Sequence, residues 1–338
     1  MPYMVLKGSG ATRDAKLWPF HGDSAINRPI GSDATFTDYA MLRDAAYPPG
    51  MNMSSWSIPV AINNPGDPLV TVTQETQCNS GGSFAGFVAG RIPEGMTGAN
   101  PQTCYRDGFL VAIDDDEMAQ GFTRFQRRTS TTAVASYHGS HGQIWHHIKL
   151  GTGYKPPPNA WPGGGTWISG FSLLAGLIRS WEVAEVMAGT RLFFPHALMV
   201  TLQYELIRTK TGGLQATTIT WPATWSDGNG GAYSGGPAAP RMGELLAIPA
   251  TFNIEATTWS IGAKALARTL QKYGCYVMGQ SDGGLKFYFE PGSQSIAISQ
   301  EDLNAVRDQV RIVSNNSALT VGGGGIYPPE LYPLPPFA

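Results

Sequence analysis

Short apolar runs separated by turn residues dominate the pattern of hydrophobic and polar positions along this chain. Segments 69–73, 108–113, 120–126 and 131–137 are rich in β-branched and aromatic residues, and glycine, asparagine or charged residues lie between them. Such runs, bounded by residues that favour turns, are typical of β-strands. The last three segments follow one another closely, so we expect them to pair as an antiparallel meander.

Helical spacing of apolar residues is clearest in segment 259–273. There Ala263, Leu266 and Leu270 fall on one face of a helix, and Gly274 follows as a residue that accepts a left-handed backbone. The spacing therefore predicts an α-helix over this segment, ended by the glycine.

Two shorter helices are predicted from the residues at their beginnings. Ser180 stands before segment 181–187, and serine readily accepts hydrogen bonds from the unpaired N–H groups of a first helical turn. Ser299 stands before segment 301–310 with Asp302 three residues on, a capping box in which aspartate replaces glutamate. We expect a short helix at each place.

Two apolar segments near the C-terminal third, 275–278 and 285–289, are separated by Ser-Asp-Gly-Gly at 281–284. Because glycine accepts a positive φ, this pattern predicts a β-hairpin. Cys275 begins the first segment and is interpreted as a buried strand residue, with a catalytic thiol as the alternative.

Composition favours many turns around a real core. Of 338 residues, 14% are charged, against roughly 25% in an average globular protein, and 42 are glycine and 25 proline. The predicted fold class is mainly β, an antiparallel β-sandwich or jelly-roll-like core with two or three short helices. The predicted organisation is an extended N-terminal arm (1–50), a single β-rich domain (51–320) and a Pro-rich C-terminal arm (321–338).

Charge and hydropathy limit the partners and the location. The net charge of −2 gives no broad positive field, so no nucleic acid is expected as a partner. The apolar stretch 168–178 is shorter than the roughly 20 residues of a membrane helix, so no membrane span is predicted. Residues 1–16 lack a secretory signal, so either a signal was removed or the protein leaves its cell by another route, such as lysis. We expect an extracellular or virion location.

No metal site and no cofactor are predicted. Cys78 and Cys104 have neither CxxC spacing nor a histidine at ligand spacing, which argues against structural zinc and leaves a bridge between them open. The run from Asp114 to Asp116 gathers the oxygen ligands that calcium prefers. It lacks the EF-hand spacing and its glycine, so a solvated hairpin tip is the favoured interpretation.

Candidate catalytic residues come from a histidine-rich segment and from carboxylates elsewhere. His138 begins segment 138–147, which holds four of the six histidines, and neutral imidazole serves as a metal ligand or general base. His196 opens an apolar run and, as a base, would need a neighbouring carboxylate, for which Glu182, Glu185 and Asp227 are the candidates. For both histidines the alternative is a side chain with purely local hydrogen bonds.

Aromatic side chains are the more suggestive feature, since nine tryptophans and 13 tyrosines include several placed among glycine and proline. Exposed rings stack on the apolar faces of sugars and anchor protein interfaces, whereas core packing is the alternative. The common nucleotide-binding, hydrolase and metalloprotease motifs are missing. The candidate binding residues are Trp145, Tyr154, Trp161, Trp167, Trp225 and Arg179.

Four further segments carry motif-like runs: GFSLLAGLIR at 170–179, HAL at 196–198, WPAT with SDG at 221–228, and ARTLQKYG at 267–274. Together they resemble segments of a family of largely uncharacterised bacterial extracellular proteins. The resemblance extends from about Trp18 to Val313. It implies an envelope or extracellular setting and a shared core, and it adds no catalytic residue.

The leading hypothesis is a glycan-directed extracellular or virion protein, such as a phage fibre or decoration component, that works by binding. Low charge, abundant aromatic and glycine residues and the Pro-rich arms motivate it. The expected partners are a polysaccharide or cell-surface glycan and further copies of the chain in a homo-oligomer or larger assembly. The alternative is a polysaccharide-degrading enzyme, either a glycoside hydrolase or a polysaccharide lyase. A third hypothesis, purely structural assembly, predicts no affinity for sugar.

Overall fold

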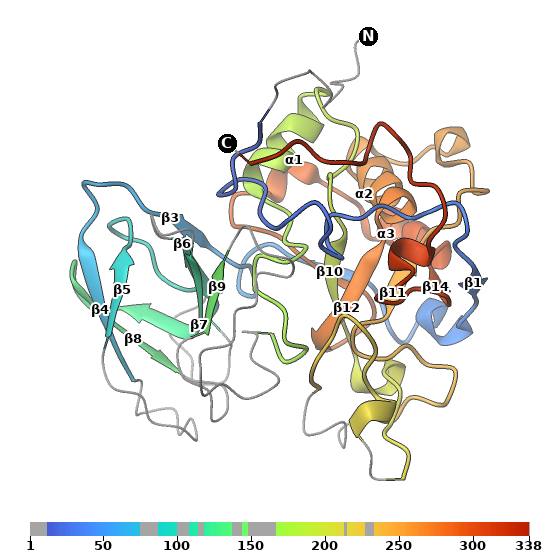
Figure 1. Cartoon of the computed structure of the whole chain (residues 1–338), viewed down its shortest axis with the longest axis horizontal. Helices are drawn as coiled ribbons and strands as arrows, with labels where there is room; N and C mark the ends of the chain where they lie inside the picture. The colour runs from blue at the N-terminus through green and yellow to red at the C-terminus, as the bar shows by residue number, and fades with distance from the viewer. Residues whose placement is uncertain are drawn as a thin grey trace.

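The computed structural model describes residues 12–74, 87–99, 108–113, 118–136, 144–147, 167–212, 215–226 and 233–337. This part of the chain is mainly β, as predicted, with its strands in two mixed sheets that lie side by side (Figure 1). The helices within these ranges are α1 (Ser180–Met187), α2 (Ile261–Lys272) and α3 (Gln300–Asp308).

The first sheet carries the helices and has the order β1-β14-β11-β12-β10-β13-β2. Most of its pairings are antiparallel, but β10 pairs with β12, and β13 with β2, in parallel. A jelly-roll order of strands is not confirmed, because the central pair of this sheet is parallel. The strands are β1 (Phe36–Thr37), β14 (Arg311–Val313), β11 (Leu245–Ala247), β12 (Cys275–Gln280), β10 (Leu198–Leu202), β13 (Lys286–Tyr288) and β2 (Gly50–Asn52).

The second sheet has the order β3-β6-β7-β8-β4-β5, and β9 pairs with the long strand β7. Strands β6, β7 and β8 pair antiparallel in chain order, so the predicted meander is confirmed. The strands are β3 (Val60–Ile62), β6 (Leu110–Ile113), β7 (Met118–Arg127), β8 (Thr132–Ser136), β4 (Leu69–Gln74), β5 (Phe87–Arg91) and β9 (Ile144–His147).

The second sheet buries apolar residues on both of its faces. Val111 and Ile113 of β6 belong to a large apolar cluster that also holds the core of the first sheet, whereas Leu110 and Ala112 belong to a smaller cluster. Successive strand residues point to opposite faces, so the alternation along β6 places one side of the second sheet against the main body. The two sheets therefore share the larger core in a sandwich-like arrangement.

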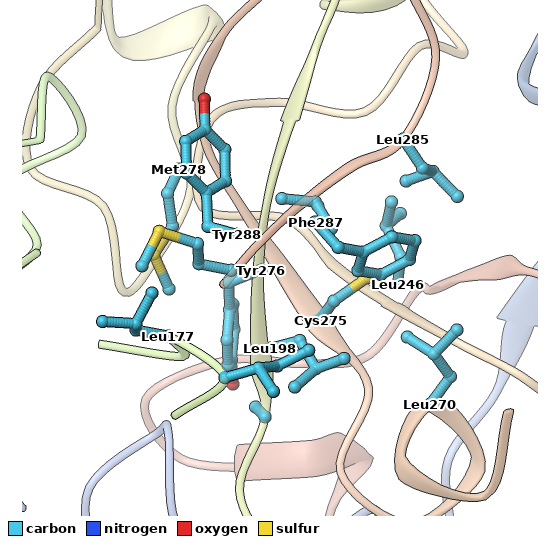
Figure 2. Close-up of a cluster of buried hydrophobic side chains, with 14 of the residues drawn as sticks. Leu177, Leu198, Leu246, Leu270, Cys275, Tyr276, Met278, Leu285, Phe287 and Tyr288 are labelled. Atoms are coloured by element: carbon cyan, nitrogen blue, oxygen red, sulfur yellow. The ribbon is translucent and has the colours of Figure 1, made fainter. Parts of the chain in front are cut away.

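The centre of the larger cluster lies on the first sheet. Figure 2 shows Leu198 of β10, Tyr276 of β12 and Phe287 of β13 packed together, and each of them is buried. Burying such a side chain stabilises the fold by about 1.5–3 kcal/mol. Cys275 is buried in the same cluster, as predicted.

Helices α2 and α3 each begin at a serine cap; the cap at Ser299 was predicted, whereas the cap at Ser260 was not. The Ser260 hydroxyl accepts a hydrogen bond from the Ala263 N–H, and the Ser299 hydroxyl accepts one from the Asp302 N–H. Asp302 does not complete a capping box, because its carboxylate accepts a hydrogen bond from the Ser260 N–H at 2.9 Å. The side chain therefore ties the beginnings of the two helices together.

The predicted hairpin of 275–278 with 285–289 is wrong, because β10 lies between β12 and β13. All five residues of β10 are buried, and a buried strand needs hydrogen-bonding partners on both edges. The intervening turn crosses the end of β10 instead. There the Ser281 N–H donates to the Leu202 carbonyl, and the Gly283 N–H donates to Gln203 Oε1.

The two ends of the described chain lie side by side over the first sheet and its helices, in blue and dark red in Figure 1. The Arg13 N–H donates to the Pro336 carbonyl, and the Ser32 N–H donates to the Ile326 carbonyl. Phe20 is fully buried. The described parts of the predicted arms, 12–50 and 321–337, thus pack on the body of their own chain.

Candidate functional site

Glu182 is placed by the beginning of helix α1. Its Oε2 atom accepts a hydrogen bond from the Arg179 N–H at 2.9 Å, as a glutamate at the third helical position does in a capping box. Ser180 is the first helical residue rather than the cap, and its hydroxyl donates to Glu290. Glu182 is therefore held inside the protein, where it is 1% exposed.

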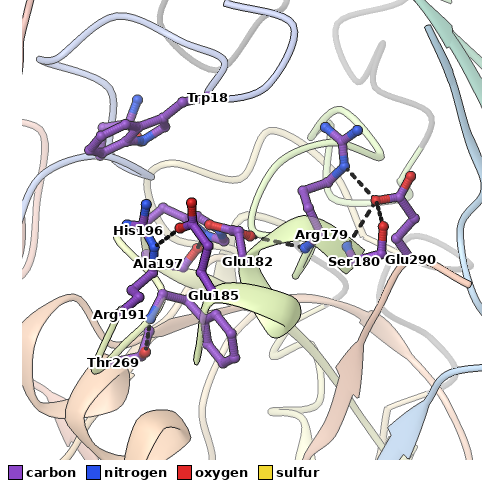
Figure 3. A network of polar contacts seen from close by, with 12 residues as sticks. Trp18, Arg179, Ser180, Glu182, Glu185, Arg191, His196, Ala197, Thr269 and Glu290 are labelled. Atoms are coloured by element: carbon purple, nitrogen blue, oxygen red, sulfur yellow. Dashed lines mark hydrogen bonds and ion pairs between the residues drawn. The ribbon is translucent and has the colours of Figure 1, made fainter. Parts of the chain in front are cut away.

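His196 precedes strand β10 and contacts Glu182 directly (Figure 3). Nε2 of the imidazole lies 3.2 Å from Oε2 of Glu182, and Nδ1 lies 2.9 Å from the Ala197 carbonyl oxygen. Both partners are acceptors, so each ring nitrogen must carry a proton to make both bonds. The geometry describes an imidazolium paired with a carboxylate.

The electrostatics of the pair agree with this geometry. Burial by itself lowers the pKa of His196, but the Glu182 carboxylate outweighs it and leaves the pKa above its ordinary value. Burial raises the pKa of Glu182, and the charge and hydrogen bond of His196 bring it below its ordinary value. The charge of Arg191 lowers the pKa of both groups, so it adds to the effect of His196 on Glu182 and opposes the effect of Glu182 on His196. The charged pair is the favoured state.

Arg179 belongs to a second ion pair beside the first, in which Arg179 is buried and Glu290 is partly buried. Its Nε atom donates to Glu290 Oε2 at 3.0 Å, and its Nη1 atom donates to the Lys16 carbonyl at 3.2 Å. The same Glu290 oxygen accepts hydrogen bonds from the Ser180 N–H and hydroxyl. The guanidinium is thus engaged within the chain, and it joins helix α1 to the N-terminal segment.

A small cavity of about 10 Å³ lies beside these pairs. Figure 3 shows Trp18 of the N-terminal segment over His196. A space of this size holds about one water molecule and no sugar ring. The lining residues are Leu17, Trp18, Pro19, Phe20, Ile26, Asn27, Leu174, Gly176, Leu177, Arg179 and His196.

The chemistry that this arrangement can perform depends on access. A histidine with a carboxylate behind it is the usual arrangement of a general base. Both ring nitrogens of His196 are engaged by acceptors here, so neither is free to accept a proton from a substrate. The pair therefore acts here as a structural contact between α1 and the beginning of β10.

Three of the predicted site residues, Arg179, Glu182 and His196, are brought together. Trp167 lies elsewhere, 6% exposed, with its ring 5.0 Å from the rings of both Phe109 and Tyr288, so it packs in the core. Trp225 is half-buried.

The remaining predicted residues are placed only in part. The backbone of Trp145 lies on β9 opposite Gln120 of β7. The predictions for His138, Tyr154, Trp161, Asp227, the Cys78 and Cys104 bridge, and Asp114 to Asp116 lie outside the described residues.

Sequence reasoning missed Trp18 and Glu290. Trp18 falls in a segment predicted to be an extended arm, and Glu290 follows an apolar strand as a single carboxylate. Glu290 is 111 positions from its partner Arg179, so no local spacing connects the two. The sequence signal for Trp18 is the run Trp18-Pro19-Phe20, in which two large aromatic residues favour burial.

Among the described residues, no group of three or more histidine, cysteine, aspartate or glutamate side chains is gathered as a metal site would require. None of the helices in the described ranges combines the length and apolar character needed to cross a bilayer.

Comparison with protein-family models, with curated proteins and with solved structures returns no match for this chain. The likeness to bacterial extracellular proteins accordingly stays a prediction from its four motif segments.

Proposed function

We propose that this chain is a glycan-directed extracellular or virion protein that works by binding, of the fibre or decoration type. The observation that carries the choice of binding over catalysis is the closed His196–Glu182 pair. Its two side chains are buried beside a cavity of about 10 Å³, which has no room for a sugar ring.

The amino-acid composition supports a glycan as the partner. Charged residues are scarce at 14%, and aromatic residues make up 11% of the chain. Aromatic rings bind the apolar faces of sugars without requiring charge. The candidate rings are those of Trp145, Tyr154, Trp161 and Trp225, since Trp167 is committed to the core.

A glycan array combined with light scattering tests the proposal. We expect the purified protein to bind a restricted set of polysaccharides and to form an oligomer. The variant Trp161→Ala should lose binding, and the matched control Trp167→Phe should keep it because that ring packs inside the protein. A monomer that ignores every glycan, or a Trp161→Ala variant that binds as well as the parent, would contradict the proposal.

The second candidate function is cleavage of a polysaccharide, and the His196–Glu182 contact is the observation that favours it. A base at 3.2 Å from an orienting carboxylate has catalytic geometry if a substrate can reach it. Release of reducing ends, or of unsaturated products that absorb ultraviolet light, would support this function. Activity that survives His196→Ala combined with Asp227→Ala would exclude these residues.

A further inference from the structure

The N-terminal segment forms the roof over His196. Six of the residues that line the small cavity come from this segment: Leu17, Trp18, Pro19, Phe20, Ile26 and Asn27. Near its C-terminal end this segment is fixed to the residue before strand β10, because the Ala197 N–H donates to the Ile26 carbonyl at 2.7 Å. The roof residues (13–28) therefore decide whether anything reaches His196.

Arg13 holds the N-terminal end of the roof, its near end, in place. Its guanidinium donates to the Trp18 and Phe20 carbonyls at 2.6 Å each, through Nη1 and Nη2. The side chain is 7% exposed, and burial lowers the pKa of Arg13 to about 10. One cation thus fixes two carbonyl groups on either side of Pro19.

The conformation that Arg13 holds is strained. Phe20 has a φ of 72°, a left-handed backbone that a bulky residue adopts only when its surroundings impose it. The Asn27 side chain amide donates to the Pro19 and Phe20 carbonyls at 2.9 and 3.0 Å, so polar contacts surround the strained residue. Loss of these contacts favours a different path for residues 17–21.

The C-terminal segment in turn holds Arg13. Nε of Arg13 donates to the Pro335 carbonyl at 2.9 Å, and the guanidinium lies 3.8 Å from the centre of the Phe337 ring. Further along, Arg28 lies over the rings of Tyr327 and Tyr332 at 5.0 and 4.3 Å. The C-terminal strap (residues 326–337) is therefore fastened to both ends of the roof.

We propose that the roof and the C-terminal strap form a latch that closes the His196–Glu182 site, with Arg13 as the residue that joins them. When the strap leaves Arg13, the near end of the roof opens and His196 becomes accessible from solvent. The latch does not depend on whether the protein binds a glycan, and it bears on the second candidate function, in which a substrate would have to reach His196.

Chemical modification of His196 tests the latch in the full-length protein. The purified chain is treated with diethyl pyrocarbonate at about pH 8.5, because the reagent reacts only with neutral imidazole. Modification is followed residue by residue by peptide mass spectrometry. His21 provides the exposed comparison within the parent protein, because its side chain is 60% exposed. In the parent protein His196 should react far more slowly than His21.

Two variants release the latch to different extents. Arg13→Ala should raise the rate constant for His196 roughly tenfold over that of the parent protein, because the roof loses both carbonyl contacts. Phe337→Ala, which removes only the ring under the guanidinium, should raise it about threefold. The matched control Arg43→Ala, which removes an arginine paired with Asp38 elsewhere on the surface, should leave the rate unchanged.

Circular dichroism and a urea unfolding curve show whether each variant is folded. If Arg13→Ala does not fold, Phe337→Ala carries the test alone. The proposal is overturned if the folded variants modify His196 as slowly as the parent, or if Arg43→Ala accelerates the reaction equally.

Discussion

Nε2 of His196 lies 3.2 Å from Oε2 of Glu182, and both side chains are buried. Sequence reasoning named the two residues as a base and a carboxylate that could meet. The structure brings them together, but as a charged pair under a closed roof. The first property in which the pair should be measurable is therefore the free energy of unfolding.

Glu182→Gln should lower the free energy of unfolding by about 3 kcal/mol at pH 6, because breaking a buried ion pair leaves His196 without its countercharge. Urea denaturation followed by fluorescence measures the change. The matched control is Glu185→Gln on the same helix, where the carboxylate is 38% exposed and paired with Arg191. That variant should lose about 1 kcal/mol or less. Equal losses in the two variants would contradict a special role for Glu182.

The same pair should give the protein a stability maximum in mildly acidic solution. The pKa of Glu182 is lowered in the folded state, so its contribution is present above the ordinary value of 4.5 and is lost as pH falls through the folded value. The pKa of His196 is raised, so its contribution is complete below 6.5 and is lost as pH rises through the folded value. Both contributions coincide between these ordinary values.

Melting temperatures measured from pH 3 to pH 9 check this expectation against the variant His196→Gln, which has no titrating ring. The parent should lose more stability than the variant on both sides of the window. Parallel profiles for the two proteins would show that the pair does not titrate in this range.

The helices were predictable because their signals are local. Apolar residues of α2 recur on one face, and Ser260 begins the helix within the same short segment. The hairpin prediction failed because strand pairing is a non-local choice. Residues 281–284 have good turn chemistry, yet β10 enters between the flanking strands from almost 80 positions away, as the 80-residue separation of Gln203 and Gly283 shows.

The candidate site was predictable only in its list of residues. Glu182 and His196 are 14 positions apart, and the sequence offered Glu185 and Asp227 as partners of His196 as well, with no signal to choose among the three. Arg179 and Glu290 meet across 111 positions, and Arg13 meets Pro335 across 322. Contacts of such separation follow from the path of the whole chain and leave no spacing pattern in the sequence.

Cys275 should resist alkylation in the folded protein. It is fully buried on β12, and burial raises the pKa of its thiol well above the ordinary value. Because the thiolate is the reactive form, iodoacetamide should label Cys275 only after denaturation, as peptide mass spectrometry would show. Native labelling at the rate of an exposed thiol would contradict this placement.

Two substitutions at Cys275 should show how the size and the polarity of this side chain each affect the free energy of unfolding. Cys275→Ala leaves a small cavity and should lower the free energy of unfolding by about 1 kcal/mol. Cys275→Ser buries a hydroxyl among apolar side chains and should cost about 2 kcal/mol. Urea denaturation of both variants measures the order. A serine variant more stable than the alanine variant would indicate a hydrogen-bonding partner at this position.

Gly176 should be the least replaceable glycine near the site. It has a φ of 75°, and an added Cβ would lie 2.3 Å from the backbone nitrogen of Met199 and 2.5 Å from the carbonyl carbon of Leu198. Strand β10 begins at Leu198, two residues after His196, so a methyl group here would push the strand and the histidine away from α1. Gly176→Ala should therefore lower the free energy of unfolding by more than about 4 kcal/mol.

Gly189 provides the matched control, because its φ of 71° is nearly the same but no atom lies within 4 Å of an added Cβ. In Gly189→Ala the only unfavourable effect is the left-handed backbone, so the free energy of unfolding should fall by about 1 kcal/mol. The difference between the two variants, measured by urea denaturation, isolates the close approach of Gly176 to β10. Equal losses would mean that residues 174–178 can move away from the strand, and that the closed geometry around His196 is looser than these contacts imply.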